Sequence, residues 1–328
     1  MLNRSANGWW VFIVMTSRTP GEILLTISID TECDHDPAWA RSNPLRFDSI
    51  NVGLPERLQP LFDEVGAIPT YLLTVEVMED DESVESLKKL QGRYEYGTHL
   101  HAAFVEPQKK FYDYAGVDSP DFQSSYAPDI ELAKLRNLTE LFKRRFGYAP
   151  TSFRAGRYGA GNHTLPALRE LGYKVDTSVT PHIRWFEPNG QADYRRAPEQ
   201  PYFPLEKQLN RAGHGPAGND DVLEVPVTVR NRLFRRYPRW FRPWYSSVDE
   251  MKDIFHYHLR RYGDQETLVI NMMFHSMEVI EAASPYPQNA DDVKKYLDDT
   301  YEILEWARNE GVVFKGLSDV REHFGKKS

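Results

Sequence analysis

The sequence predicts an α/β protein that folds as a distorted or incomplete (β/α) barrel with about seven parallel strands. Short runs of β-branched and apolar residues alternate with runs of helical periodicity, which favours parallel strands joined by right-handed crossovers. The alternation continues over residues 22–320, which is long enough to favour a barrel over an open sheet. Several intervals between the strand-like runs lack a proper helix, so we expect the barrel to be irregular.

In the first half of the chain, EILLTISID at 22–30 is predicted as a strand from its β-branched and leucine content. The segment 54–66 has apolar residues at helical spacing and ends at a glycine, which is typical of a helix and its stop. The next elements are a strand at 68–77, an acidic helix near 81–91 and a strand at 94–101.

In the second half, the clearest helix is 129–147, whose leucine and phenylalanine stripe ends at Gly147. A shorter helix at 162–172 has Asn162 as its expected N-cap and a glycine at its end. Two longer helices are expected near 247–262 and 290–310. The remaining strand-like runs are 151–156, 173–179, 222–229, 267–275 and 312–317.

The composition is that of a globular protein with a sizeable core, since 41% of the 328 residues are hydrophobic and 13% are aromatic. The net charge of -8 argues against nucleic acid as the main partner. Cys33 is the only cysteine, which excludes an intrachain disulfide and an all-cysteine metal site. A single thiol fits a reducing compartment, and we expect a cytoplasmic protein.

The first 20 residues, MLNRSANGWWVFIVMTSRTP, precede the first strand-like run. Their apolar stretch, Trp9 to Met15, is too short to span a bilayer, which takes about 20 residues. We expect residues 1–20 to be a flexible or dispensable leader, and an export signal or a membrane-surface anchor is the alternative. Residues 21–328 then form a single barrel domain.

Residues suited to hydrolysis stand at the carboxyl ends of five predicted strands. They are Asp30, the pair His99 and His101, Arg154, Asp176 and His275. In barrels of parallel strands the active site lies at that edge. The sequence therefore predicts that these side chains form one site.

The histidine pair is the most informative part of this set. His99 and His101 are two residues apart on a predicted strand, so both imidazoles face the same side and can share a metal ion. His256 and His258 have the same spacing, but they fall on a predicted helix, where residues two apart do not share a face.

Five short stretches carry a resemblance to a known family. They are TISIDTECD, GTHLHAAF, FRAGRYG, VDTSV and MMFHSMEV, in this order. The ordered set resembles the polysaccharide deacetylase family, the carbohydrate esterases of the nodulation-factor deacetylase type. The resemblance covers residues 22–320 and implies a metal-dependent barrel enzyme.

The stretches depart from the family pattern at two places. The family has two adjacent aspartates, of which one is the base and the other a metal ligand. In this chain the resemblance implies that Asp30 is the base and Asp34 the metal ligand, with Glu32 as the alternative ligand. The family's second histidine lies four residues after the first, which is Ala103 here, and His101 takes its place. A divergent subgroup is therefore expected, and the substrate cannot be transferred.

The resemblance implies removal of an acetyl group from an N-acetylated sugar or polysaccharide, lipid-linked substrates included. A divalent metal, expected to be zinc because the ligands mix nitrogen and oxygen, would be held by Asp34, His99 and His101. Asp30 would act as base, held ionised by Arg154. His275 would act as acid with Asp176 as its partner and with help from its neighbour Glu278. The residues expected to bind substrate are Arg157, Tyr158, Glu278, Trp240 and Trp244.

The segment 230–245, RNRLFRRYPRWFRPWY, is rich in arginine and aromatic residues and has no acid. One interpretation is an insertion that packs on the barrel while its arginines pair with acidic residues. The other is a lip that stacks sugars or contacts an anionic membrane surface.

Three other functions remain open from the sequence. The first is hydrolysis of another linear or cyclic amide, because the metal site does not define the acyl group. The second is a catalytically inactive barrel that binds carbohydrate without metal, since the aspartate and histidine motifs are altered. The third is a glycosidase, which needs two carboxylates facing each other about 5–10 Å apart with no metal between them.

Overall fold

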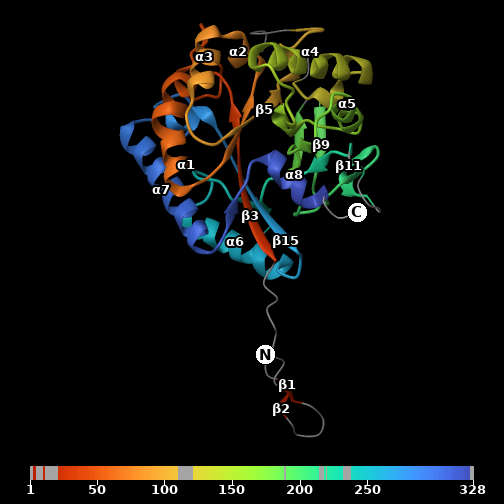
Figure 1. Cartoon of the computed structure of the whole chain (residues 1–328), viewed down its shortest axis with the longest axis vertical. Coiled ribbons are helices and arrows are strands. Elements are labelled where there is room, and N and C mark those ends of the chain that lie inside the picture. The colour runs from red at the N-terminus through yellow and green to blue at the C-terminus, as the bar shows by residue number, and fades with distance from the viewer. Residues whose placement is uncertain are drawn as a thin grey trace.

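The computed structural model describes residues 3–4, 10–11, 21–109, 121–187, 190–213, 218, 220–231 and 238–325 (Figure 1). Part of the predicted insertion, residues 232–237, lies outside the described residues. Within the first 20 residues, β1 (Asn3–Arg4) and β2 (Trp10–Val11) form an antiparallel pair. The prediction of a dispensable leader stays a prediction.

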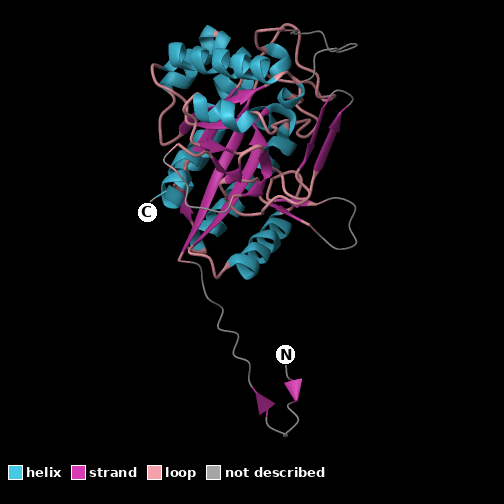
Figure 2. Ribbon diagram, turned by 90° about the vertical axis from the view of Figure 1, so that its right-hand side faces the viewer, coloured by secondary structure: helices cyan, strands magenta, loops and turns pink. Residues whose placement is uncertain are grey.

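A single parallel sheet forms the centre of the molecule and curls into a distorted barrel, as the sequence predicts (Figure 2). Seven strands follow one another in the order β12-β7-β6-β5-β4-β3-β15, and β16 pairs with β3 on the side of the path. The strands are β3 (Glu22–Thr31), β4 (Pro69–Leu73), β5 (Glu95–Leu100), β6 (Ser152–Ala155), β7 (Val175–Asp176), β12 (Leu223–Glu224), β15 (Thr267–His275) and β16 (Val313–Phe314).

The helices lie outside the sheet (Figures 1 and 2). They are α1 (Gln59–Val65), α2 (Val75–Glu79), α3 (Asp81–Lys89), α4 (Pro128–Phe146), α5 (Thr164–Glu170), α6 (Val248–Tyr262), α7 (Ala290–Asn309) and α8 (Leu317–Gly325). Their ends follow ordinary capping rules: Ser247 and Glu250 form a capping box at α6, and Gly147 ends α4 at a φ of 82°. The helix expected over 54–66 begins earlier, as the π-helical η1 (Ser49–Leu58), and continues into α1.

Three predicted strands differ from the observed ones. The strand expected over 68–77 ends at Leu73, because the chain turns at Thr74 into α2. The strand expected over 173–179 is reduced to β7, since the Asp176 carboxylate accepts from the backbone N–H of Ser178 and the chain leaves the sheet there. The run 222–229 is divided between β12 and β13 (Val229–Arg230), which pairs with β14 (Arg239–Trp240).

Two antiparallel hairpins were not anticipated by the alternating pattern. One joins β8 (Arg184–Glu187) to β9 (Gly190–Asp193), and the other joins β10 (Pro204–Leu205) to β11 (Gln208–Ala212). The run Pro-Asn-Gly at 188–190 is the sequence signal for a turn at the first of them. Both hairpins come from the long interval between β7 and β12.

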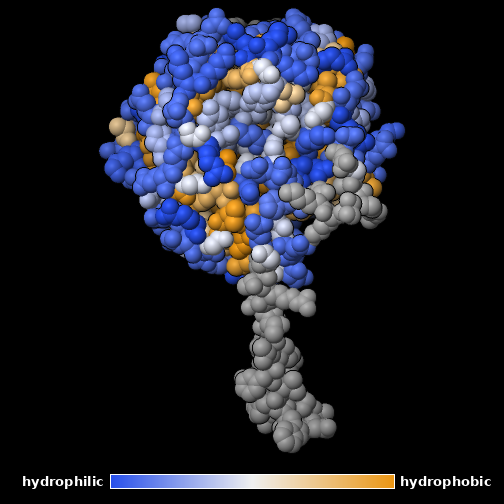
Figure 3. Space-filling model, viewed as in Figure 1, coloured by the Kyte–Doolittle hydropathy of each residue, from blue (hydrophilic) through white to orange (hydrophobic). Residues whose placement is uncertain are grey.

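The apolar side chains of the strands and the inner faces of the helices form the core, in which Ile27, Phe62, Leu138 and Phe274 are fully buried. The face seen in Figure 3 is mainly hydrophilic, with apolar residues in smaller patches. None of the helices in the described part of the chain is long and apolar enough to cross a membrane.

Candidate metal centre and active site

Strand register brings the predicted residues together at one edge of the sheet. In the β3–β15 pair, Asp30 lies opposite His275, and in the β5–β6 pair His99 lies opposite Arg154. A cavity of about 320 Å³ opens at this edge. Its walls are Asp30, Glu32, His35, Trp39, Arg41, His99, His101, Asp121, Phe122, Ala155, Arg157, Tyr158, Trp185, Trp240, Arg242, Tyr245 and His275.

Glu32, His99 and His101 converge on one point in this cavity. The Glu32 Oε1 atom lies 3.3 Å from Nε2 of His99 and 3.3 Å from Nε2 of His101. All three side chains are buried, and their ligand atoms lie within 4.8 Å of one another. The predicted pairing of the two imidazoles on one face is therefore observed.

The far nitrogens of both rings are held by acceptors. His99 Nδ1 donates to the carbonyl oxygen of Arg154 at 3.0 Å, and His101 Nδ1 lies 2.7 Å from Asp121 Oδ2. In the neutral imidazole the proton therefore sits on Nδ1, and the Nε2 lone pair faces Glu32. Partners of this kind fix the orientation of histidines that ligate metals.

The carboxylates around this point favour a positive charge there. Burial alone would lower the pKa of His101, but the carboxylates of Asp121 and Glu32 raise it to about 10. Burial likewise opposes ionisation of Glu32, yet His101 and His99 hold the pKa of that carboxyl well below its usual range. With its pKa raised to about 10, His101 carries a proton on Nε2 at neutral pH in the absence of a metal, and a divalent ion bound here would take the place of that proton.

Asp30 lies beside this group and is held by Arg154. Arg154 is fully buried and donates to Asp30 Oδ1 at 2.6 Å, while Asp30 Oδ2 lies 3.7 Å from His99 Nε2 and 3.8 Å from His275 Nε2. Burial favours the neutral acid, but Arg154 and the two histidines keep the pKa of Asp30 below its usual value. Asp30 is therefore an ionised carboxylate with one oxygen directed toward the cavity.

His275 is oriented by its neighbour Glu278 and not by Asp176, the partner first expected for it. Its Nδ1 lies 2.9 Å from Glu278 Oε1 and 3.2 Å from Nη2 of Arg242, which also forms an ion pair with Glu278. Burial opposes ionisation of Glu278, but Arg242 and His275 lower the pKa of its carboxyl. Glu278 thus occupies the position that the sequence analysis gave to Asp176.

The structure does not bring Asp176 into the cavity. One of its oxygens accepts from the backbone and hydroxyl of Ser178, and Glu224, equally buried, lies beside it. β7 does end at Asp176, but the side chain points to a neighbouring loop.

Replacing Asp176 is expected to change how stability depends on pH. Burial, the largest cause, raises the pKa of Asp176 to about 6. The native state then binds this proton more tightly than the unfolded chain, so wild-type stability falls as pH rises from about 4 to about 6. Asp176→Asn should lack this fall and gain on the order of 2 kcal/mol relative to wild type by pH 7.5. Urea unfolding of both proteins at pH 4.5 and 7.5 measures this change in unfolding free energy. If the wild type and Asp176→Asn differed by the same amount at both pH values, the raised pKa of Asp176 would be contradicted.

Asp34, the preferred ligand in the sequence analysis, is not part of the cluster. Its carboxylate accepts from the backbone N–H groups of Asp48 at 2.8 Å and Ser49 at 3.1 Å, and so fixes the start of η1. The alternative, Glu32, supplies the carboxylate, and its second oxygen lies 3.4 Å from Arg41 Nη2.

Asp34→Asn is expected to weaken the fold but to leave metal binding intact. The amide can accept only one of the two hydrogen bonds, so a loss of about 1–3 kcal/mol in unfolding free energy is expected. Metal content and urea denaturation, measured on the same preparation, separate the two effects. Loss of metal with unchanged stability would restore Asp34 as the ligand.

The predicted substrate-binding residues fall in three places. Arg157, Tyr158 and Trp240 line the cavity, and Glu278 is buried behind His275. Trp244 packs against Tyr286 and Tyr296 and does not line it. The sequence analysis missed several wall residues: His35, Trp39, Arg41, Asp121, Phe122, Trp185, Arg242 and Tyr245.

The described parts of the basic-aromatic segment, 230–231 and 238–245, pack on the barrel. Arg239 pairs with Glu250 at 3.2 Å, and Arg242 pairs with Glu278. These contacts match the interpretation of a packed insertion with paired arginines. Trp240 and Tyr245 at the same time form part of the cavity wall.

Comparison with known proteins shows which solved structures share this fold. No family model matches the sequence. No curated protein matches it either. Solved structures do match: a protein from Parabacteroides distasonis described as a glycoside hydrolase/deacetylase has a TM-score of 0.61 at 14% identity, over 95% of this chain and 73% of that one. One from Mycobacterium smegmatis described as a polysaccharide deacetylase has a TM-score of 0.51 at 15% identity, over 99% and 95%.

A third structure, from Pseudomonas aeruginosa PAO1, is described as a polysaccharide deacetylase. It has a TM-score of 0.54 at 12% identity, over 94% of this chain and 92% of that one. The identities are low, so the likeness is one of fold. The chain therefore has the fold of the polysaccharide deacetylases, in a form that diverges strongly in sequence.

Proposed function

We propose that the chain is a metal-dependent hydrolase that removes an acetyl group from an N-acetylated sugar. The observation that carries this proposal is the convergence of Glu32, His99 and His101 on one point beside Asp30 and His275. The shared fold with deacetylases supports the reaction class.

The donor set fits a divalent transition metal. One carboxylate oxygen and two imidazole nitrogens from Glu32, His99 and His101 form a mixed set suited to Zn²⁺. Three protein ligands are typical of catalytic sites, which keep a further position for water or substrate. When bound, such an ion lowers the pKa of a coordinated water toward ~7 and polarises the substrate carbonyl.

Asp30 is placed to act as the general base. Arg154 occupies its Oδ1, and its Oδ2 faces the cavity beside His99 and His275. The Arg154 guanidinium keeps the carboxylate ionised and oriented, so Oδ2 can accept a proton as water attacks the acetyl carbon.

His275 is placed to act as the general acid. Glu278 accepts from its Nδ1, which leaves Nε2 directed toward the cavity side that Asp30 faces. From this nitrogen a proton can pass to the departing sugar amine. General acid–base steps of this kind contribute typically ~10²–10⁴-fold to rate.

The aromatic walls suit a sugar ring. Tyr158 and Trp185 stack at 5.1 Å between ring centroids, and the Trp39 ring lies 5.1 Å from the His275 ring. Such rings offer flat apolar faces to the C–H face of a sugar while the histidines and acids contact its polar groups.

Removal and return of metal tests this function. The purified protein is incubated with a panel of N-acetylated mono- and oligosaccharides, and released acetate is measured before and after chelation. We expect release by the native protein, loss on chelation, and recovery when Zn²⁺ or Co²⁺ is added back. A protein that contains no metal and binds sugars without releasing acetate would instead be a carbohydrate-binding barrel.

Hydrolysis of a cyclic amide is the second candidate. The structure of the allantoinase PuuE matches this chain with a TM-score of 0.52 at 11% identity, over 98% of this chain and 93% of that one. The same cluster of a carboxylate, two histidines and a base suits that reaction. Including allantoin in the panel and measuring ring opening distinguishes the two.

A further inference from the structure

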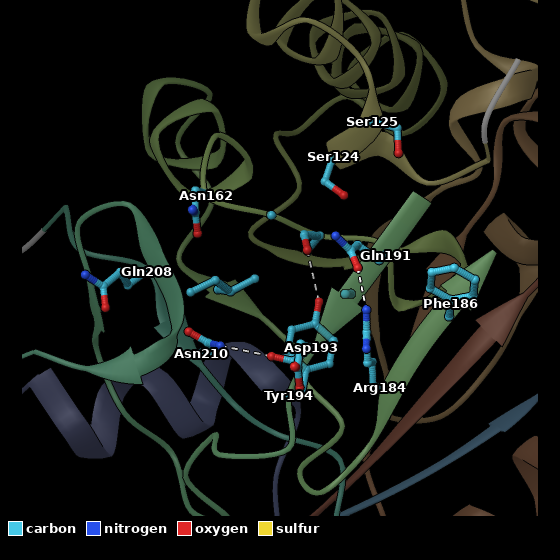
Figure 4. Close-up of a pocket in the computed structure, with 14 residues that line it drawn as sticks. Ser124, Ser125, Asn162, Arg184, Phe186, Gln191, Asp193, Tyr194, Gln208 and Asn210 are labelled. Atoms are coloured by element: carbon cyan, nitrogen blue, oxygen red, sulfur yellow. Dashed lines mark hydrogen bonds between the residues drawn. The ribbon is translucent and has the colours of Figure 1, made fainter. Parts of the chain in front are cut away.

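Figure 4 shows a second and larger cavity, which has a volume of about 790 Å³. Four segments form it: the β8–β9 hairpin, β11, the turn at 124–125 and the loop 160–162. The labelled side chains in Figure 4 surround one hollow between these segments. Its lining includes none of the proposed catalytic or metal-binding residues.

Neighbouring residues of the same segments line the two cavities. Phe122 and Tyr158 line the active-site cavity, and Ser124 and Ala160, two residues further along each segment, line the second one. The Tyr194 hydroxyl donates to the carbonyl oxygens of Tyr158 at 2.8 Å and Ala160 at 3.1 Å, which fastens β9 to the same loop.

The strand β8 separates the cavities. Its Trp185 faces the active-site cavity, whereas its neighbours Arg184 and Phe186 face the second one. Alternate residues of a strand point to opposite sides, so this hairpin presents one face to each hollow. The second cavity therefore begins within one or two residues of the active-site cavity on three segments, 122–124, 158–160 and 184–186.

The lining of the second cavity is polar and close to neutral. Asp193 pairs with Arg195 at 2.6 Å, and Arg184 donates to the neutral Gln191 side chain at 2.8 Å, so the charged side chains of the lining are one anion and one cation. The remaining polar side chains are hydroxyls and amides, which can both donate and accept. This chemistry matches the hydroxyl groups of a sugar and offers no cluster of cations to a phosphate.

An exposed aromatic ring completes the lining. The Phe186 side chain is 72% exposed, which is unusual for a large apolar residue, and it lies at the edge of the cavity. A flat ring at the rim of an amide-rich hollow provides a stacking platform for the apolar face of a sugar.

We propose that this second cavity binds uncharged sugar residues of an oligosaccharide whose N-acetylated residue lies in the active-site cavity. The proposal rests on the proposed function for its reactive end, but binding in the second cavity does not require turnover. The greater volume, about 790 Å³ against about 320 Å³, suits more than one sugar unit. Linear or branched neutral glycans are therefore the substrate class.

Binding to an array of neutral oligosaccharides of one to six units tests the proposal, with the full-length protein carrying Asp30→Asn to prevent turnover. We expect binding to oligomers of at least one sugar type and weaker binding to the matching monosaccharide. Adding Phe186→Ala should lower affinity for the oligomers by about tenfold, and adding Gln208→Ala should lower it in the same direction. Both residues are exposed, so these variants should fold.

Tyr148→Ala is the matched control, since Tyr148 is another exposed aromatic, outside both cavities. It should bind oligomers as the parent does. The proposal is overturned if no neutral oligosaccharide binds, or if Phe186→Ala and Gln208→Ala bind them as well as the parent. Failure of the proposed function appears separately, as absence of metal or of acetate release in the wild-type protein.

Discussion

His99→Ala is expected to lose the bound metal and to reduce kcat/KM for acetate release by at least about 10³-fold, because a Lewis acid contributes several kcal/mol to such a transition state. His99 is one of only two imidazoles in the cluster, and Glu32 faces its Nε2 at 3.3 Å. Removal of the ring leaves one imidazole and one carboxylate, which hold a divalent ion weakly. Metal content by mass spectrometry and acetate release, measured on the same sample, test this.

Two further variants test whether loss of metal and of activity is specific to the proposed metal ligands. Asp121→Asn alters only the partner of His101 Nδ1 and should weaken metal affinity by about 10–100-fold, as expected for a residue that orients a ligand. His256→Ala removes an imidazole on α6, outside the cavity, and should change neither quantity. Unchanged metal and unchanged acetate release in His99→Ala would exclude the proposed site.

Arg154→Met is expected to destabilise the fold by about 3–5 kcal/mol, because it leaves the buried Asp30 carboxylate without its charged partner. Arg154 is fully buried and also donates to the Thr177 carbonyl at 3.0 Å and the Ser28 hydroxyl at 2.5 Å. Urea denaturation at pH 7 measures the loss. The double variant Arg154→Met/Asp30→Asn should recover part of it, since no unpaired charge then remains.

Arg154→Met should also shift the pH dependence of kcat/KM. Arg154 and the neighbouring histidines keep the pKa of Asp30 low against its burial, so the ionised form stabilises the native state above the unfolded pKa. That contribution disappears as pH falls through the lower, folded value. In Arg154→Met the pKa of Asp30 rises, and the acidic limb of kcat/KM should shift to higher pH. An unshifted limb, or an undiminished stability, would mean that Arg154 does not control Asp30.

Much of the candidate site could be predicted because parallel strands end at one edge. Asp30, His99, Arg154 and His275 each close a strand, and the register then sets them in adjacent pairs. Side-chain parity does not separate Glu32 from Asp34, because they lie two and four residues after Asp30 and would share a face of a continued strand. The strand ends at Thr31, and the Asp34 carboxylate instead accepts from the backbone at the start of η1, a contact that strand periodicity does not predict.

The rest of the cavity could not be found in the same way. Arg41, Asp121, Trp185 and Arg242 lie on segments outside the central sheet, and their positions depend on packing between parts of the chain far apart in sequence. Arg242 shows the difficulty, since it comes from a segment that reads as a surface insertion and yet is 3% exposed beside Glu278. Strand periodicity carries no information on such contacts.

Anomalous X-ray diffraction at the zinc absorption edge, from crystals grown with Zn²⁺, tests the central claim most directly. A single peak is predicted in the active-site cavity, bonded to Glu32 and to the Nε2 atoms of His99 and His101 at about 2.0–2.2 Å. A peak held by Asp34, or no peak at these three side chains, would contradict the proposed metal centre.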